Sequence, residues 1–196
     1  MTVEEITEKL KADRRNQSYT ERGVFPVFQI SPEAKIQIIG QAPGRKVEES
    51  GIPFSDKSGE KLIHWLGISP DTFYSPEIAI VPMDFYYPGK RKSGDLPPRK
   101  FIAEEYHPEI LKMMPNIQCT ILIGKYAADW YLKGRTKKNL TETVASYKEY
   151  LPEYFPIVHP SPLNFRWQAK NPWFEEQVVP ELQKVVHAIL QTADPA

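Results

Sequence analysis

The chain has 196 residues, of which 41% are hydrophobic and 26% are charged, and its 25 basic and 25 acidic side chains give a formal net charge of zero. These values are typical of one globular domain with a core of its own, and they argue against a disordered chain or a strongly basic nucleic-acid coat. We therefore expect a single domain over residues 1–196, with its core at about residues 34–191.

Several classes of protein are excluded by particular residues that are present or missing. No run of about 18 apolar residues occurs, which excludes a membrane span. The acidic start, Met1 to Glu5, lacks an apolar signal core and predicts a cytoplasmic protein. The single cysteine, Cys119, excludes an internal disulfide and any cysteine-based zinc or iron–sulfur site. We expect no metal and no cofactor, because metal-ligand spacing is also missing from the histidines: His64, His107, His159 and His187.

Helical and strand patterns alternate along the chain. In chain order they predict a helix at residues 4–14, a strand at 35–39, a helix at 57–66, a strand at 77–81, a helix at 99–114, a strand at 119–123, a helix at 125–132, a strand at 155–158 and a helix at 172–190. This alternation predicts an α/β protein with a mostly parallel sheet covered on both faces.

The segments that follow the predicted strands are polar or rich in glycine and proline. In parallel sheets, ligands bind at the carboxyl ends of the strands, so these segments are where chemistry is expected. They are Gly40 to Gly44, Pro82 to Asp84, Gly124 to Tyr126 and His159 to Pro162.

The first such segment reads Gly40-Gln41-Ala42-Pro43-Gly44. Pro43 fixes its own φ, and Gly44 permits a close approach of the backbone to a ligand. The simpler interpretation of these five residues is a tight strand exit of the kind found in any α/β protein.

A second motif precedes the helix predicted at residues 57–66. Asp56 is a candidate helix cap, and Ser58 and Gly59 lie in the first turn, where free N–H groups and the helix dipole favour a phosphate. Pro53 and Phe54 would hold an aromatic ring on a stiff loop, suited to stacking on a base. An isolated Pro-Phe pair also serves as a hydrophobic plug.

The third motif, His159-Pro160-Ser161-Pro162-Leu163-Asn164, directly follows a predicted strand. A lone histidine is more often structural than catalytic. Here the prolines stiffen a short loop that carries a hydroxyl and a leucine. Such a loop is suited to pressing on a phosphate backbone and pushing an apolar wedge into a base stack.

Taken in this order, the three motifs resemble those of the uracil-DNA glycosylase superfamily. They match its Gly-x-x-Pro-Gly loop, its Gly-x-Pro-Phe segment (Gly51 to Phe54 here) and its late His-Pro-Ser loop. The match is closest to the prokaryotic branch whose first motif reads Gly-Glu-Ala-Pro-Gly, and it covers about residues 36–190. The resemblance implies a three-layer α/β/α fold around a central, mostly parallel four-stranded sheet.

The resemblance also implies roles for individual residues in hydrolysis of the N-glycosidic bond of a deaminated base. Gln41 and Ala42 would border the attacking water beside Gly40, Pro43 and Gly44. Phe54 would stack on the base, and His159 would stabilise the departing base. The DNA contacts would come from one loop and two helix starts: Ser58, Gly59, Lys125, Ser161, Pro162, Leu163, Asn164 and Arg166.

Three departures from the branch pattern affect the chemistry. The four cluster-binding cysteines of the branch are missing. Its first-motif glutamate is Gln41 here, and an amide orients water but takes no proton, a loss worth about 10²–10⁴-fold in rate. Glu48 and Asp56 are candidate substitutes, although Asp56 is equally well explained as a helix cap.

The third departure lies at the end of the second predicted strand, where the family reads the base with an asparagine. If Asp84 takes that place, its carboxylate only accepts hydrogen bonds, which predicts a preference for hypoxanthine or another deaminated purine over uracil. The alternative is that Met83 faces the pocket and Asp84 serves as a capping or salt-bridge residue.

Basic side chains gather near these loops, among them the segment 88–99 with Lys90, Arg91 and Lys92. Such clusters are ordinarily solvated faces, but over a substrate channel they would steer phosphates. The leading hypothesis is a monomeric base-excision DNA glycosylase that binds DNA and needs no cofactor. The alternatives are a superfamily member that binds damaged or single-stranded DNA without cutting it, and a hydrolase or sensor of free nucleosides or nucleotides.

Overall fold

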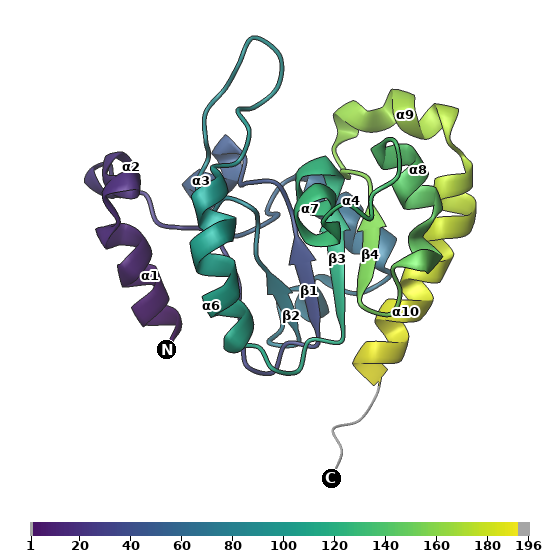
Figure 1. Ribbon diagram of the computed structural model, residues 1–196, viewed down its shortest axis with the longest axis horizontal. Helices are drawn as coiled ribbons and strands as arrows, with labels where there is room; N and C mark the ends of the chain where they lie inside the picture. The colour runs from purple at the N-terminus through teal and green to yellow at the C-terminus, as the bar shows by residue number, and fades with distance from the viewer. Residues whose placement is uncertain (1, 192–196) are drawn as a thin grey trace.

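The computed structural model describes residues 2–191, which are built around one parallel sheet (Figure 1). The strands are β1 (Ile36–Ile39), β2 (Ile78–Ile80), β3 (Cys119–Ile123) and β4 (Tyr154–Ile157). Their order across the sheet is β2-β1-β3-β4, and every neighbouring pair is parallel. The predicted four-stranded parallel sheet is therefore confirmed.

The sheet is buried on both faces, which is why its strands are almost uninterrupted apolar runs. In β1, Ile36 and Ile38 point into one hydrophobic cluster while Ile39 points into the other. Gln37 is the polar exception in β1. It is fully buried, and its side-chain oxygen accepts a hydrogen bond from the hydroxyl of Thr120 at 3.3 Å.

One face of the sheet is covered by α4 (Lys57–Leu66) and α10 (Val179–Gln191). These two helices pack on each other as well as on the strands. Trp65 of α4 meets Phe174, just before α10, edge to face, with ring centroids 4.9 Å apart. Apolar side chains at helical spacing thus give this layer its core.

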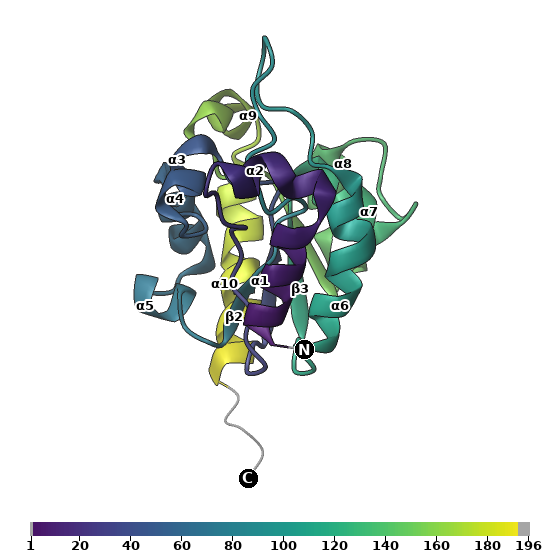
Figure 2. The ribbon, with the colours of Figure 1, turned by 90° about the vertical axis from the view of Figure 1, so that its left-hand side faces the viewer.

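The other face is covered by α1 (Val3–Ala12), α6 (His107–Lys112) and α7 (Gly124–Leu132). Figure 2 shows the two helical layers on opposite sides of the sheet, with α4 and α5 (Pro70–Phe73) on one side and α6 and α7 on the other. The three-layer α/β/α fold is therefore the observed one.

Several short helices were not predicted from the sequence. They are α2 (Gln17–Glu21), α3 (Arg45–Ser50), α5, α8 (Leu140–Ala145) and α9 (Phe165–Lys170). Helices of four to six residues are too short to show a 3.6-residue period, so only their caps could reveal them. Ser69 before Pro70 and Asn139 before α8 are such caps, because each side chain accepts a hydrogen bond from the first turn.

Between β2 and α6 the chain rises in a hairpin that stands above the carboxyl edge of the sheet (Figure 1, top). The N–H of Leu96 donates to the carbonyl of Gly89 at 2.8 Å, and that of Arg91 to the carbonyl of Gly94 at 2.9 Å. We call residues 88–98 the basic hairpin, because Lys90, Arg91 and Lys92 are exposed along it. It stands at the edge of the sheet where the predicted motifs meet.

Candidate active site

A cavity of about 220 Å³ lies at the carboxyl edge of the sheet. All three predicted motifs contribute to its walls: Gly40, Gln41, Ala42, Pro43 and Gly44 from the first, Pro53, Phe54, Asp56 and Ser58 from the second, and His159 and Ser161 from the third. Segments more than 100 residues apart in the sequence thus converge on one hollow, as the parallel topology requires.

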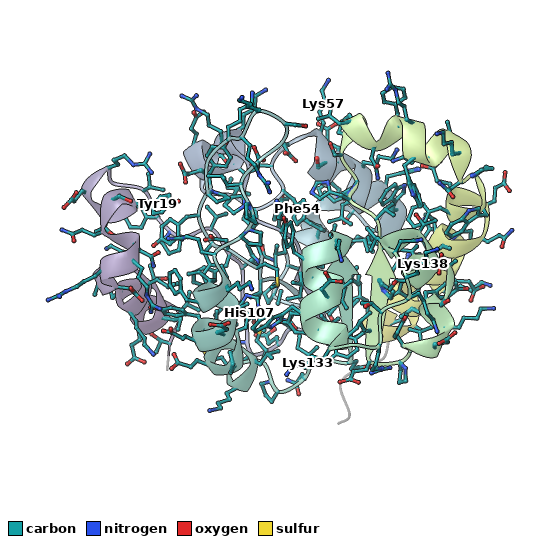
Figure 3. All side chains as sticks on the ribbon, turned by 45° about the horizontal axis from the view of Figure 1, so that its top comes forward. Tyr19, Phe54, Lys57, His107, Lys133 and Lys138 are labelled. Carbon is teal, nitrogen blue, oxygen red and sulfur yellow. The ribbon has the colours of Figure 1, made fainter. Side chains whose placement is uncertain are left out.

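Phe54 packs closely against two glycines, whose missing side chains leave room for it. Its own backbone is left-handed, with φ of 55°, which is uncommon for a bulky residue. A Cβ at Gly40 would lie 3.2 Å from the tip of the Phe54 ring, and a Cβ at Gly59 would overlap the Phe54 carbonyl. The ring also meets Phe73 edge to face, at 6.3 Å between centroids. The cavity therefore has an aromatic wall in a fixed orientation (Figure 3, where Phe54 is labelled).

His159 presents a neutral imidazole to the cavity. Its Nδ1 accepts a hydrogen bond from the backbone N–H of Ser161 at 3.1 Å, so the ring proton is on Nε2. Burial lowers the pKa of His159, against the opposing effect of the carboxylates of Asp56 and Asp95. Asn164 donates to the carbonyl of His159 at 3.1 Å and fixes the loop. The side chain is thus a preorganised hydrogen-bond donor.

The first motif is fixed by the chain that leaves β2. The N–H of Met83 donates to the carbonyl of Gly40 at 2.8 Å, and the N–H of Asp84 donates to the carbonyl of Gln41 at 3.1 Å. The Gln41 side chain is half-buried on the cavity wall. Its amide can orient a water molecule there but cannot take a proton from it.

Asp84 is not placed to read a base. It is fully buried and forms a bidentate ion pair with Arg99, whose Nε and Nη2 each lie 2.8 Å from a carboxylate oxygen. The backbone N–H groups of Tyr86 and Arg99 bind the same oxygens at 3.1 and 3.0 Å. With all four acceptor positions used, the salt-bridge alternative is the one observed, and the predicted preference for deaminated purines loses its basis.

Met83 does not face the cavity either. It is 5% exposed and packs in the hydrophobic cluster on the α6 and α7 side of the sheet. The wall at the end of β2 is formed instead by Pro82.

The side chain of His107 fixes Pro82, because its Nε2 donates to the carbonyl of Pro82 at 2.9 Å while its Nδ1 accepts from the hydroxyl of Tyr131 at 2.7 Å. Burial lowers the pKa of His107 to about 4. The side chain is labelled in Figure 3.

The two candidate substitute carboxylates occupy different positions. Glu48 does not border the cavity, and its Oε2 accepts a hydrogen bond from the N–H of Tyr87 at 3.0 Å. Asp56 does border it, and one of its oxygens also caps α4 by accepting from the N–H of Gly59 at 3.1 Å. The helix-cap interpretation of Asp56 is thus observed together with a place on the cavity wall.

The residues expected to contact DNA divide into two groups. Ser58 and Ser161 line the cavity, whereas Leu163 is 89% exposed beside it in the loop after β4. Arg166 is exposed in the same region, with its guanidinium over the ring of Phe165 at 5.7 Å. Lys125 lies apart, because it pairs with Asp129 at 2.6 Å and borders a different, much smaller cavity.

The cavity also contains residues that sequence reasoning missed. Val27, Val47 and Ile80 add apolar wall, and Asp95 adds a carboxylate from the basic hairpin. The backbone N–H of Val27 donates to the carbonyl of Phe85 at 2.8 Å, which brings the N-terminal segment to this edge. Nothing in local spacing signals Val27 or Asp95, because both come from segments outside the three motifs, whereas Val47 follows the first motif in α3 and Ile80 ends β2.

Neither a metal-binding group nor a membrane-spanning helix is found within residues 2–191. Within that range no three or more histidine, cysteine, aspartate or glutamate side chains are grouped so that they could hold a metal ion. Within the same range no helix has the length and apolar character needed to cross a membrane.

A solved structure and a family profile are similar to this chain. A solution NMR structure from Methanosarcina acetivorans, of a protein provisionally named a uracil DNA glycosylase, shares 12% sequence identity over 80% of this chain and 93% of that one, with a TM-score of 0.48. The sequence profile of the Uracil DNA glycosylase superfamily matches residues 27–183, which is most of the chain and contains every motif described above. The chain therefore belongs to the uracil DNA glycosylase superfamily.

Proposed function

We propose that the protein is a monofunctional DNA glycosylase that hydrolyses the N-glycosidic bond of a deaminated base flipped out of DNA. The observation that carries the proposal is the pairing of the fixed Phe54 ring with the neutral His159 on the walls of one cavity. Its volume of about 220 Å³ is below that of pockets for drug-sized ligands and suits a small planar ligand such as a single base.

The chemistry follows from where charge develops as the bond breaks. The base leaves with the electron pair of the C1′–N bond, so negative charge builds on its ring and carbonyl oxygens. A donor already aimed at that charge stabilises the transition state more than the ground state. The Nε2–H of His159 supplies this donor, and burial, which lowers the pKa of the imidazole, favours its neutral form. Stacking on Phe54 would orient the base for the reaction.

The surface around the cavity suits a DNA strand. Leu163 and Phe165, 89% and 61% exposed, stand beside the cavity as apolar groups able to enter a base stack. Arg166 and the basic hairpin add cations at the same edge. Because the net charge of the chain is zero, DNA affinity would depend on this local cluster, and we expect it to fall steeply with salt.

One alternative function is supported by a specific residue. Gln41 lacks the proton-accepting carboxylate of the matching family motif, which favours a protein that binds damaged DNA without cutting it. Base release from oligonucleotides with single uracil, hypoxanthine or xanthine residues, single- and double-stranded, separates the two. Detectable release by the wild type supports the glycosylase, and tight binding without release on any substrate supports the alternative.

The variants His159→Ala and Gln41→Glu sharpen this experiment. Loss of the donor at His159 should lower the single-turnover rate by about 10²–10³-fold. Restoring a carboxylate with Gln41→Glu should raise it. His64→Ala is the matched control, because His64 is exposed on α4 and does not border the cavity. Equal rates for wild type and His159→Ala would contradict the proposed role of the imidazole.

A further inference from the structure

We propose that Asp95 is the carboxylate that accepts the proton of the attacking water, an inference that rests on the glycosylase function proposed above. Asp95 borders the same cavity as Gln41 and His159, although it belongs to the basic hairpin rather than to any of the three motifs. It brings a proton acceptor to a site whose first motif has none.

A chain of hydrogen bonds fixes the Asp95 carboxylate through Tyr87. The hydroxyl of Tyr87 donates to Oδ1 of Asp95 at 3.2 Å. Tyr87 itself is fixed at both backbone atoms: its N–H donates to Glu48 at 3.0 Å, and its carbonyl accepts from the hydroxyl of Tyr19 at 2.9 Å. Glu48 is thus a positioning residue, acting on Asp95 through Tyr87.

The other carboxylates near the site are worse placed for this task. Glu48 is engaged by the backbone of Tyr87 and does not border the cavity. Asp84 is saturated by Arg99. Asp56 borders the cavity, but accepting a proton there would weaken its cap on α4. The Asp95 carboxylate accepts its hydrogen bond from the hydroxyl of Tyr87 and caps no helix, so taking up a proton would not weaken a helix.

The position of Asp95 on the basic hairpin also makes catalysis depend on DNA binding. The hairpin that carries it exposes Lys90, Arg91 and Lys92 a few residues away, and its two arms are joined by the bonds between Gly89 and Leu96 and between Arg91 and Gly94. A phosphate held by these cations would hold the hairpin over the cavity, and with it the carboxylate.

In the proposed step, the C1′–N bond breaks and its electron pair leaves with the base. The water oxygen bonds to C1′, and one water proton passes to the Asp95 carboxylate. His159 keeps its own proton and donates a hydrogen bond to the leaving base. Transfer of this proton from Asp95 to the base, directly or through solvent, restores the enzyme and gives an abasic sugar and a neutral free base.

The test compares Asp95→Asn, Asp95→Glu and Tyr87→Phe with the wild type, on the deaminated base that the wild type releases best. Single-turnover base release reports the chemical step, and affinity for DNA with a tetrahydrofuran abasic site reports binding. Asp71→Asn is the control, because Asp71 is exposed on α5 away from the cavity. We expect Asp95→Asn to release base about 10²-fold or more slowly with affinity changed less than threefold. Asp95→Glu should retain part of the rate, and Tyr87→Phe should lose less than Asp95→Asn.

Three results would overturn the inference. If the wild type is active and Asp95→Asn is within threefold of its rate, Asp95 accepts no proton. If Asp95→Asn loses DNA affinity by the same factor as rate, Asp95 only shapes the hairpin. If the wild type releases no base, the proposed function fails, and this inference fails with it.

Discussion

His107 is a buried, titratable side chain that supports the wall of the cavity through its hydrogen bond to Pro82. It is 2% exposed, donates to the carbonyl of Pro82 and accepts from the hydroxyl of Tyr131. Burial lowers its pKa from 6.5 to about 4. Between these two pH values the unfolded chain binds a proton that the folded protein does not. The free energy of unfolding therefore rises with pH through this window.

The size of the effect follows from the two pKa values. The contribution of His107 to stability is complete above about pH 6.5 and is lost as the pH falls toward 4. The shift of about 2.5 pH units corresponds to about 3 kcal/mol at most, of which about 2 kcal/mol is already lost at about pH 5. For a domain of this size, 2 kcal/mol amounts to about 4–8 °C in Tm.

Urea unfolding at pH 8, 6 and 5 measures this contribution, with His107→Gln as the reference. Glutamine keeps one donor and one acceptor but does not titrate, so both proteins share every other pH-dependent group. The wild type should lose about 2 kcal/mol more than His107→Gln between pH 8 and 5. Parallel pH dependences for the two proteins would refute the claim that His107 is held neutral.

Two further predictions concern the residues that shape the site. Arg99→Met leaves Asp84 charged, buried and without its cation, so urea unfolding should show a loss of about 3–5 kcal/mol, and Asp84→Asn in the same chain should recover part of it. A loss below 1 kcal/mol would contradict this account. Gly59→Ala should lower the free energy of unfolding by about 1–3 kcal/mol through its clash with Phe54, whereas Gly44→Ala, with open space at its Cβ, should differ from wild type by less than 1 kcal/mol. Equal losses for the two glycine variants would argue against the clash.

The sheet could be predicted from the sequence because its strands are buried on both faces. Each strand is a short apolar run, and each is followed by glycine, proline or a polar residue at the carboxyl edge. The three motifs could be placed together for the same reason, since parallel strands end on one side. Short helices such as α3 and α9 left no periodic signal.

Asp84 shows why the rest of the site could not be predicted. Its position after β2 suggests a ligand contact, and only the fold shows that Arg99, fifteen residues later, occupies its carboxylate. Asp95 is the opposite case, because it lies in a charged loop with no motif and reaches the cavity by the path of the hairpin. Contacts between segments distant in the sequence therefore decide that Asp84 is removed from the cavity and that Asp95 borders it.

The Asp84–Arg99 ion pair also restricts how the site can be altered. Arg99 extends from Asp84 to Asn16 at 2.9 Å and lies over the ring of Tyr19, so it joins the N-terminal helices to the base of the hairpin. Replacing Arg99 alone would leave the buried Asp84 carboxylate without its cation, and replacing Asp84 alone would leave Arg99 without its carboxylate, so a change at one position lowers stability. A library of variants aimed at the end of β2 should therefore change Asp84 and Arg99 together. Its starting points should be pairs of uncharged residues whose volumes match those of the original pair.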